Sequence, residues 1–315
     1  MTRRVLGVGA GTSGGSAEIL LKAALMEAQA AGAEVAWLRV DDVRIGTEGP
    51  LFGNHDDDCR WFFEQVMAAD GVIYSAPIYS RLLPGKLRLL ADRVFGPHAD
   101  VGFIELLMER EAAGEPITVP FVPDERVLRP RVAAFIAVGG ALTDQWGTLA
   151  LPMMHSLAFS MRSGVVDQVR FSGAGTPRSI VLDPAALARA RQLGRNVAEQ
   201  LGRAYEDVEY RGEPGLCPLC HLNLIELTGR HVECGSCGAE GRLEIGPDGE
   251  PTVVFDAAGL EKSVNHPVEK RAHSEEILST AAEHAARAGE VAAGAAPYAD
   301  WGEPLVPDRV APVTA

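Results

Sequence analysis

The chain has 315 residues, 47% of them hydrophobic, so two domains and a sizeable core are feasible. Its formal net charge of −14 argues against a nucleic-acid or anionic-membrane partner, because both require a basic surface. No apolar run approaches the roughly 18 residues of a membrane span, so no membrane partner is expected. Four of the five cysteines form one cluster, which indicates a metal site and a cytoplasmic location.

Short apolar runs alternate with helical patterns along the first part of the chain. Strands are expected at residues 5–9, 34–40, 71–75, 132–138 and 165–171. Helices are expected at 16–31, 61–67, 86–94, 148–163 and 184–205, with Asp183 as the N-cap of the last. This alternation predicts an α/β fold with a doubly wound, five-stranded parallel sheet, in the order 2-1-3-4-5.

The chain is expected to divide into a sheet domain (1–208), a small cysteine module (213–258) and a C-terminal tail (262–315). The sheet domain contains an insertion at 96–130, with a helix expected at 101–111, which we interpret as a lid, a subunit contact or both. The tail begins with a polar helix and is expected to end in an extended segment that is either disordered or wraps a neighbouring subunit. We therefore expect a homodimer or homotetramer.

Apolar and aromatic residues follow the central strand where a loop would ordinarily be polar. Pro77, Ile78, Tyr79 and Ser80 come directly after the strand at 71–75. Because open α/β sheets bind ligands at the carboxyl ends of their strands, these residues predict a wall for a flat ligand. The alternative is a loop packed on a neighbouring subunit.

The glycine-rich loop after the first strand has two ligand-binding interpretations. Gly9–Gly14 fits the G-x-G-x-x-G dinucleotide pattern, but the acidic residue that this pattern needs is displaced, since Glu34 begins the second strand and Asp41 lies beyond it. The rival is a monophosphate loop made of backbone N–H groups, hydroxyls and a helix N-terminus. A turn without a ligand is the third interpretation. The candidate phosphate-binding residues are Gly11, Thr12, Ser13, Gly14, Gly15 and Ser16.

The segment from Ser75 to Arg93 resembles the flavin-contacting segment of the NADPH-dependent FMN reductase and iron–sulfur flavoprotein group. The matching residues are Pro77, Tyr79, Lys86 and the Asp92–Arg93 pair, and the resemblance extends over about residues 3–202.

This resemblance implies a flavodoxin-like fold that binds FMN and uses NAD(P)H as co-substrate. The loop at 11–16 would hold the phosphate, and Gly139 and Gly140 would lie beside the flavin edge, where glycine permits close backbone approach. The phosphate loop departs from the family in lacking an arginine. The loop before the second helix contains only Cys59, so an iron–sulfur cluster is not expected there.

Three residues are candidates for proton transfer. His98 or His155 could protonate a substrate as hydride arrives, because an unperturbed histidine titrates near neutral pH. The alternative is a packed or surface histidine. Tyr79 is the third candidate, although ring stacking is the more natural role for it.

Two C-x-x-C knuckles, thirteen residues apart, predict a metal centre with Cys217, Cys220, Cys234 and Cys237 as ligands. The module resembles a zinc ribbon. Zinc is expected, with rubredoxin-like iron as the alternative, since both metals accept four thiolates. Four protein ligands leave no open position, which indicates a structural role.

We therefore expect an FMN-dependent NAD(P)H oxidoreductase that passes electrons to a small-molecule acceptor such as a quinone, a flavin, a nitroaromatic or another unsaturated compound. The alternative is a flavodoxin-like electron-transfer or scaffold protein whose ribbon docks a partner.

Overall fold

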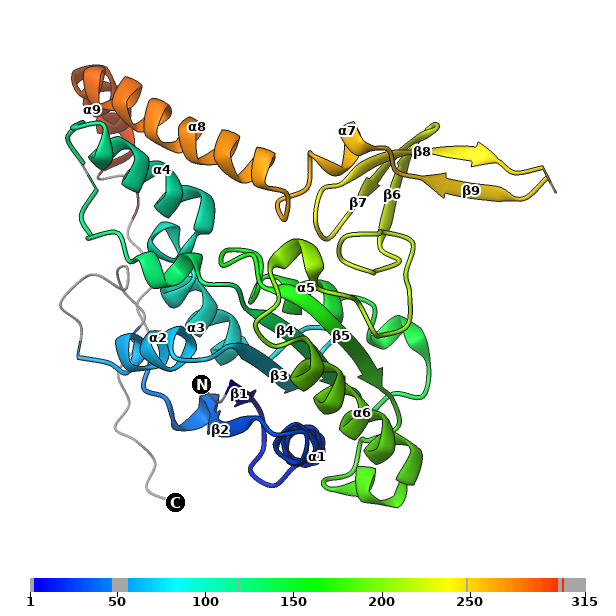
Figure 1. The fold of residues 1–315 in the computed structure, drawn as a ribbon. Helices are drawn as coiled ribbons and strands as arrows, with labels where there is room; N and C mark the ends of the chain where they lie inside the picture. Colours follow the sequence, from blue (N-terminus) through cyan, green and yellow to red (C-terminus); the bar gives the residue numbers. More distant parts are fainter. Residues whose placement is uncertain (1–2, 47–55, 118, 248, 300–301, 303–315) are drawn as a thin grey trace. The chain divides into compact units, whose positions relative to one another are not determined.

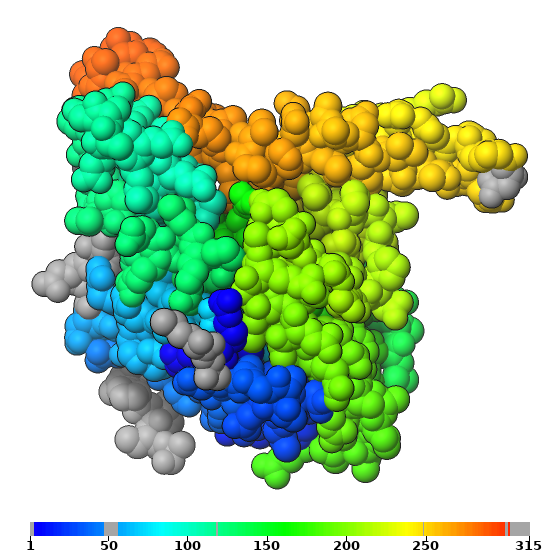
Figure 2. Space-filling model, in the orientation of Figure 1, coloured from blue at the N-terminus to red at the C-terminus, as the bar shows by residue number. Residues whose placement is uncertain are grey.

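The computed structural model describes residues 3–46, 56–117, 119–247, 249–299 and 302. The chain forms two compact units, Met1–Arg271 and Ala272–Ala315. The predicted sheet domain and the cysteine module both belong to the first unit, so they are packed together as one body. Figure 2 shows the chain from residue 185 into this module, light green to yellow-green, as one continuous surface.

The first unit is built on a five-stranded parallel sheet in the order β2-β1-β3-β4-β5, which confirms the predicted order (Figure 1). Every residue of β4 is buried, as expected for an interior strand covered on both faces. The strands are β1 (Arg4–Gly9), β2 (Glu34–Arg39), β3 (Gly71–Pro77), β4 (Val132–Val138) and β5 (Gly164–Phe171).

Helices cover both faces of this sheet. One apolar core includes side chains of α2, α3, α4 and α5, and the other includes those of α1 and α6. Gly194 lets α6 touch α1, because a Cβ there would lie 1.9 Å from the Ala24 carbonyl oxygen. The helices are α1 (Ser16–Ala30), α2 (Cys59–Met67), α3 (Gly85–Val94), α4 (Val101–Ala112), α5 (Ala150–His155) and α6 (Pro184–Gln200).

Two predicted helix boundaries have different outcomes. The Asp183 side chain accepts a hydrogen bond from the Ala186 N–H (3.0 Å), which confirms the N-cap of α6. The predicted helix at 148–163 is much shorter, because α5 ends at His155. The Ser156 hydroxyl donates to the Met153 carbonyl (2.7 Å), and the N–H groups of residues 156–158 bond carbonyls three residues back, so the chain continues as tight turns.

The insertion packs into the core of the first unit. Its predicted helix is α4, and the Asp100 carboxylate caps it by accepting from the Gly102 and Phe103 N–H groups. The buried Arg131 guanidinium donates to four backbone carbonyls, including those of Met67 and Arg126, and so anchors the end of the insertion.

The cysteine module is a four-stranded antiparallel sheet in the order β6-β7-β8-β9, followed by a short helix, α7 (Ala257–Leu260). We call residues 213–258 the ribbon. Its strands are β6 (Ile225–Thr228), β7 (His231–Cys234), β8 (Glu240–Ile245) and β9 (Pro251–Val254).

The C-terminal segment contains α8 (Pro267–Ala286) and α9 (Ala288–Ala299). The expectation of an extended segment is wrong as far as Ala299, because alanine has the strongest helix propensity and this stretch is rich in it. The end of the predicted tail lies outside the described residues. None of the described helices is long and apolar enough to cross a bilayer.

Candidate functional site

Three cavities follow one another along the carboxyl edge of the sheet. The first, of about 150 Å³, adjoins the glycine-rich loop, and the second, of about 270 Å³, adjoins the loops after β3 and β4. They use alternating residues of the same loops: Pro77 and Tyr79 line the first, and Ile78 and Ser80 line the second. The third, of about 520 Å³, extends to the ribbon. We call them the phosphate, ring and ribbon cavities.

The phosphate cavity has the features that a phosphate group needs. It is lined by Thr12, Gly15 and Ser16 at the N-terminus of α1, where first-turn N–H groups favour an anion. The Ser16 hydroxyl is buried, and within the described part of the chain it has no hydrogen-bond partner, so a ligand oxygen would satisfy it. Gly11 has φ +94°, and a Cβ there would lie 2.6 Å from Pro77 Cγ. These observations fit the phosphate of FMN.

Two carboxylates accept hydrogen bonds from the backbone of the glycine-rich loop and stabilise its conformation. The Gly11 N–H donates to Asp41 Oδ2 (3.1 Å) and the Gly14 N–H to Glu18 Oε2 (3.0 Å). Lys86 Nζ donates to the Asp41 carbonyl (2.7 Å), which gives this family-matching lysine a structural contact. Although partial burial opposes it, hydrogen bonds from Lys22 and Gly14 keep the pKa of Glu18 below its ordinary value, so it is ionised at neutral pH.

A positive charge lies beside the loop, from a segment far along the chain. A Cβ on Gly14 would lie 3.6 Å from the Arg178 guanidinium, which comes from the loop between β5 and α6. Arg178 adopts φ +65°, a left-handed conformation that is unfavourable for a residue other than glycine. An arginine held in this conformation beside the loop supplies the charge that residues 11–16 lack.

Two glycines line the ring cavity and allow a close approach between loops. Gly139 and Gly140 line it, and a Cβ on Gly140 would lie 2.9 Å from Gly175 Cα, so the loops after β4 and β5 nearly touch between the first two cavities. Of the predicted cofactor-binding residues, those along the phosphate and ring cavities are Thr12, Gly15, Ser16, Pro77, Ile78, Tyr79, Ser80, Gly139 and Gly140. Gly11, Ser13 and Gly14 belong to the same loop but line neither cavity.

Sequence reasoning missed the contribution of the last strand and the loop that follows it. Arg170 and Ser172 line the ring cavity, and Gly175 and Pro177 line the phosphate cavity. The signal was available, because SGAGTPRS is a second glycine-rich loop at a carboxyl strand end. Trp146, which is 56% exposed, also lines the ring cavity.

The structure places His155 away from these cavities, which does not support its predicted acid role. It is buried, its ring packs on Phe135 (centroids 5.0 Å apart), and its Nε2 lies 2.9 Å from Gln168 Oε1. Burial lowers its pKa to about 4, although the Gln168 hydrogen bond opposes the shift. The Gln168 amide donates in turn to the Cys220 carbonyl (2.9 Å), so His155 helps to tie the ribbon to the sheet.

His98 is likewise a core residue and lines none of the three cavities. Its ring packs between Phe63 and Phe121 (centroids 5.7 and 6.0 Å away). Burial lowers its pKa to about 4, against an ordinary 6.5. Tyr79, the third candidate acid, is half-exposed and lines the phosphate cavity.

Acid is expected to destabilise the protein through His98. Because its folded-state pKa lies below its unfolded-state pKa, the unfolded chain binds a proton between pH 6.5 and about 4 that the folded chain does not. This stability is fully present above pH 6.5 and falls by up to about 3 kcal/mol as the pH drops to 4. In denaturant titrations across this range, His98→Phe should flatten the profile, whereas the exposed His273→Gln should not. Equal slopes in all three proteins would contradict the assignment.

Within the Asp92–Arg93 pair of the family segment, Arg93 is structural, whereas Asp92 pairs with Arg88 on the surface of α3. Arg93 Nη2 lies 2.7 Å from Asp57 Oδ2, and both side chains are about 5% exposed. The other oxygen of Asp57 accepts from the Cys59 N–H (3.1 Å), so the pair fixes the start of α2. Burial raises the pKa of the Cys59 thiol to about 11, which makes it unreactive as a nucleophile.

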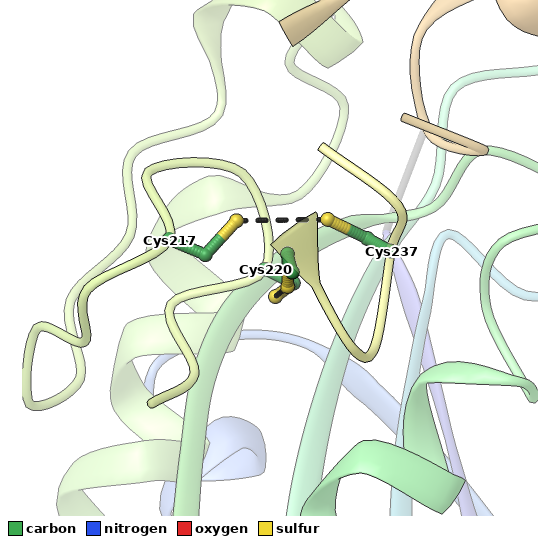
Figure 3. Close-up of side chains that lie close together, drawn as sticks. Cys217, Cys220 and Cys237 are labelled. Carbon is green, nitrogen blue, oxygen red and sulfur yellow. Dashed lines mark hydrogen bonds between the residues drawn. The ribbon is translucent and has the colours of Figure 1, made fainter. Parts of the chain in front are cut away.

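The four cysteines of the ribbon converge as their spacing predicts. Cys217, Cys220, Cys234 and Cys237 are buried, and their sulfurs lie within 4.8 Å of one another. Figure 3 labels three of them, Cys217, Cys220 and Cys237. The Cys217–Cys237 and Cys220–Cys234 sulfur pairs are 3.5 and 3.4 Å apart. A tetrahedral centre with Zn–S bonds of about 2.3 Å needs sulfur separations of about 3.8 Å, so the donor set fits a four-thiolate metal.

Comparisons with known proteins agree with this site. Residues 3–172 match the family model of NADPH-dependent FMN reductase. The flavone synthase cfoJ of Aspergillus candidus is 36% identical over 279 residues, which cover 83% of this chain and 84% of that protein. A solved structure of a flavone reductase has 29% sequence identity and a TM-score of 0.81, and the match covers 97% of this chain and 100% of that one. The chain therefore belongs to the NADPH-dependent FMN reductase family and is an NAD(P)H-dependent FMN oxidoreductase.

Proposed function

We propose that the enzyme transfers hydride, by way of its flavin, to the carbon–carbon double bond beside the ring carbonyl of a flavone-type compound. The main support for this proposal is that the similarity to a flavone reductase extends over nearly the whole chain. The flavone reductase matches 97% of this chain, so the similarity continues well beyond residues 3–172 and through the ribbon. The flavone synthase points to the same class of substrate.

The roles of the chain's own residues follow from their positions. Bound FMN would supply the two-electron chemistry, with NAD(P)H as the hydride source. Ser16 and Arg178 would hold its phosphate, and Gly139 and Gly140 would admit the edge of its ring. Among the described residues, the only ionisable side chains that line the ring cavity are two arginines. We therefore assign to water the proton that accompanies the hydride when a double bond is reduced.

The test is anaerobic turnover of flavone by the FMN-loaded enzyme with NADPH or NADH. We expect NAD(P)H oxidation to match the formation of a product two mass units heavier, with one NAD(P)H and one proton consumed per double bond. Menadione serves as a comparison acceptor. Rapid reduction of menadione with flavone recovered unchanged would contradict the proposed substrate class and leave the family assignment intact.

We also propose zinc at the four-cysteine site, because four buried thiolates with structural spacing suit it. Metal analysis distinguishes it from iron, which would colour the protein red.

A homodimer or homotetramer remains a proposal, supported by exposed apolar side chains such as Leu142 and Leu182 (87% and 83% exposed) near the site. Analytical ultracentrifugation tests it. A cytoplasmic location stays a prediction.

A further inference from the structure

The ribbon cavity lies outside the residues assigned to the flavin. Its volume of about 520 Å³ is within the range of about 300–1,000 Å³ that small-molecule sites occupy. Leu151 and Pro152 of α5 form one wall, and Leu222 and Leu224 of the ribbon form the other. The cavity therefore has an apolar interior that neither the sheet domain nor the ribbon makes alone.

This cavity is continuous with the ring cavity. Gly147 and Arg170 line both. A Cβ on Gly147 would lie 2.6 Å from Arg170 Cδ, so the arginine stem lies directly against the glycine backbone. Arg170 Nη1 donates to the Asp144 carbonyl (3.0 Å), and its other nitrogen pairs with the Asp144 carboxylate. A molecule in the ribbon cavity would thus reach the proposed flavin past this single junction.

The polar groups of the cavity indicate the charge of its occupant. Arg170 is neutralised by Asp144, so the cavity carries no net positive charge for the phosphates of NAD(P)H. Thr148 and Asn223 add neutral polar groups. Asn223 Oδ1 accepts from the Leu216 N–H (2.8 Å), which leaves the amide nitrogen as a donor. Apolar walls with a few neutral donors suit a flat, uncharged molecule with carbonyl or phenolic oxygens.

The ribbon wall is anchored on the four-cysteine cluster. Residues 222–224 come two to four positions after Cys220, and the Leu222 carbonyl accepts from the N–H of Cys217, another member of the cluster (3.1 Å). The Leu224 carbonyl accepts from the Gly235 N–H (3.0 Å), next to Cys234. From the sheet side, Gln168 donates to the carbonyls of Cys220 and His221. Both C-x-x-C knuckles therefore position this wall.

We propose that the ribbon cavity is the acceptor subsite of the enzyme, and that Leu222, Asn223 and Leu224 determine which acceptors fit. The metal ribbon then acts as the fixed wall of a substrate site. The identity of the acceptor as a flavone rests on the function proposed above, but the location of the subsite does not.

The experiment compares acceptors of different size in the FMN-loaded, metal-loaded enzyme. Flavone and 9,10-phenanthrenequinone need the whole subsite, whereas 1,4-benzoquinone is small enough to reach the flavin at the Gly147–Arg170 junction without contacting Leu224. We expect Leu224→Trp to raise the KM for the two large acceptors at least tenfold. The KM for benzoquinone and the rate of flavin bleaching by NAD(P)H should change less than twofold. The control is Leu227→Trp, because Leu227 is 57% exposed on β6 and lines none of the three cavities.

If Leu224→Trp loses its metal or fails to fold, Asn223→Asp is the variant that tests the proposed acceptor subsite. It keeps the oxygen that bonds Leu216 and replaces the amide donor with a negative charge, so the KM for both large acceptors should rise about tenfold. An equal rise in the KM for benzoquinone, or no rise in the KM for the large acceptors, would contradict the proposed subsite. If no form reduces flavone but the phenanthrenequinone KM rises selectively, the subsite stands and the flavone proposal fails.

Discussion

Replacing Cys237 with serine is expected to release the metal and to lower the melting temperature by about 10 °C or more. The reason is the small size of the ribbon core. Among the described residues, the buried members of this core are the four cysteines with Leu222 and Ala239. Too little apolar surface is buried there to fold the ribbon without a metal. Gln168 of β5 is hydrogen-bonded to the ribbon. Unfolding of the ribbon would therefore also expose part of the sheet domain.

Metal content and thermal unfolding of the same samples test this prediction. We expect one metal per chain in the native protein and in Cys59→Ala, because Cys59 is buried in the sheet domain and is not part of the cluster. FMN binding should survive in Cys237→Ser, since the phosphate and ring cavities contain no ribbon residue. Full metal content and an unchanged melting temperature in Cys237→Ser would show that the cluster is not a metal site.

Replacing Arg178 with glutamine is expected to weaken FMN binding by about 10- to 100-fold. A hydrogen bond to a charged group contributes about 1.5–3 kcal/mol, and each 1.4 kcal/mol is a factor of ten in the dissociation constant. The guanidinium of Arg178 lies against Gly14, and it supplies the positive charge that the phosphate loop lacks. Flavin fluorescence titration measures the change.

Riboflavin is the discriminating ligand, because it carries the same ring without the phosphate. Its affinity should be the same in Arg178→Gln and in the native protein. Arg191→Gln, an exposed arginine on α6 that lines none of the three cavities, should bind FMN normally. Equal losses for FMN and riboflavin would show that Arg178 supports the fold of the loop and not the phosphate.

Much of the site was predictable because its signals are local. The four cysteines were predicted from two short spacings, and the Asp183 cap from two adjacent residues. The strand order followed from alternating strands and helices together with right-handed crossovers. The glycine loop was ambiguous between two ligands, and the observed order β2-β1-β3-β4-β5 matches the flavodoxin type.

For the two histidines, the structure supports the packed alternative over the acid role, because no local sequence pattern specifies burial. His98 and His155 each lie near a predicted loop, where an ionisable ring suggests chemistry. Both are buried against aromatic rings from other parts of the fold, His98 between Phe63 and Phe121 and His155 on Phe135. The insertion was expected to be a lid, a subunit contact or both, and none of its described residues lines any of the three cavities.

The sequence by itself determined the strands, most of the helices, the four-cysteine cluster and the loop that begins α1, because each depends on residues a few positions apart. Only the tertiary structure decided that Arg178 lies beside Gly14, and that Leu222 and Leu224 face α5 across a cavity. Those pairs are separated by 70 or more residues along the chain, so their contacts depend on the packing of whole elements and not on any local pattern.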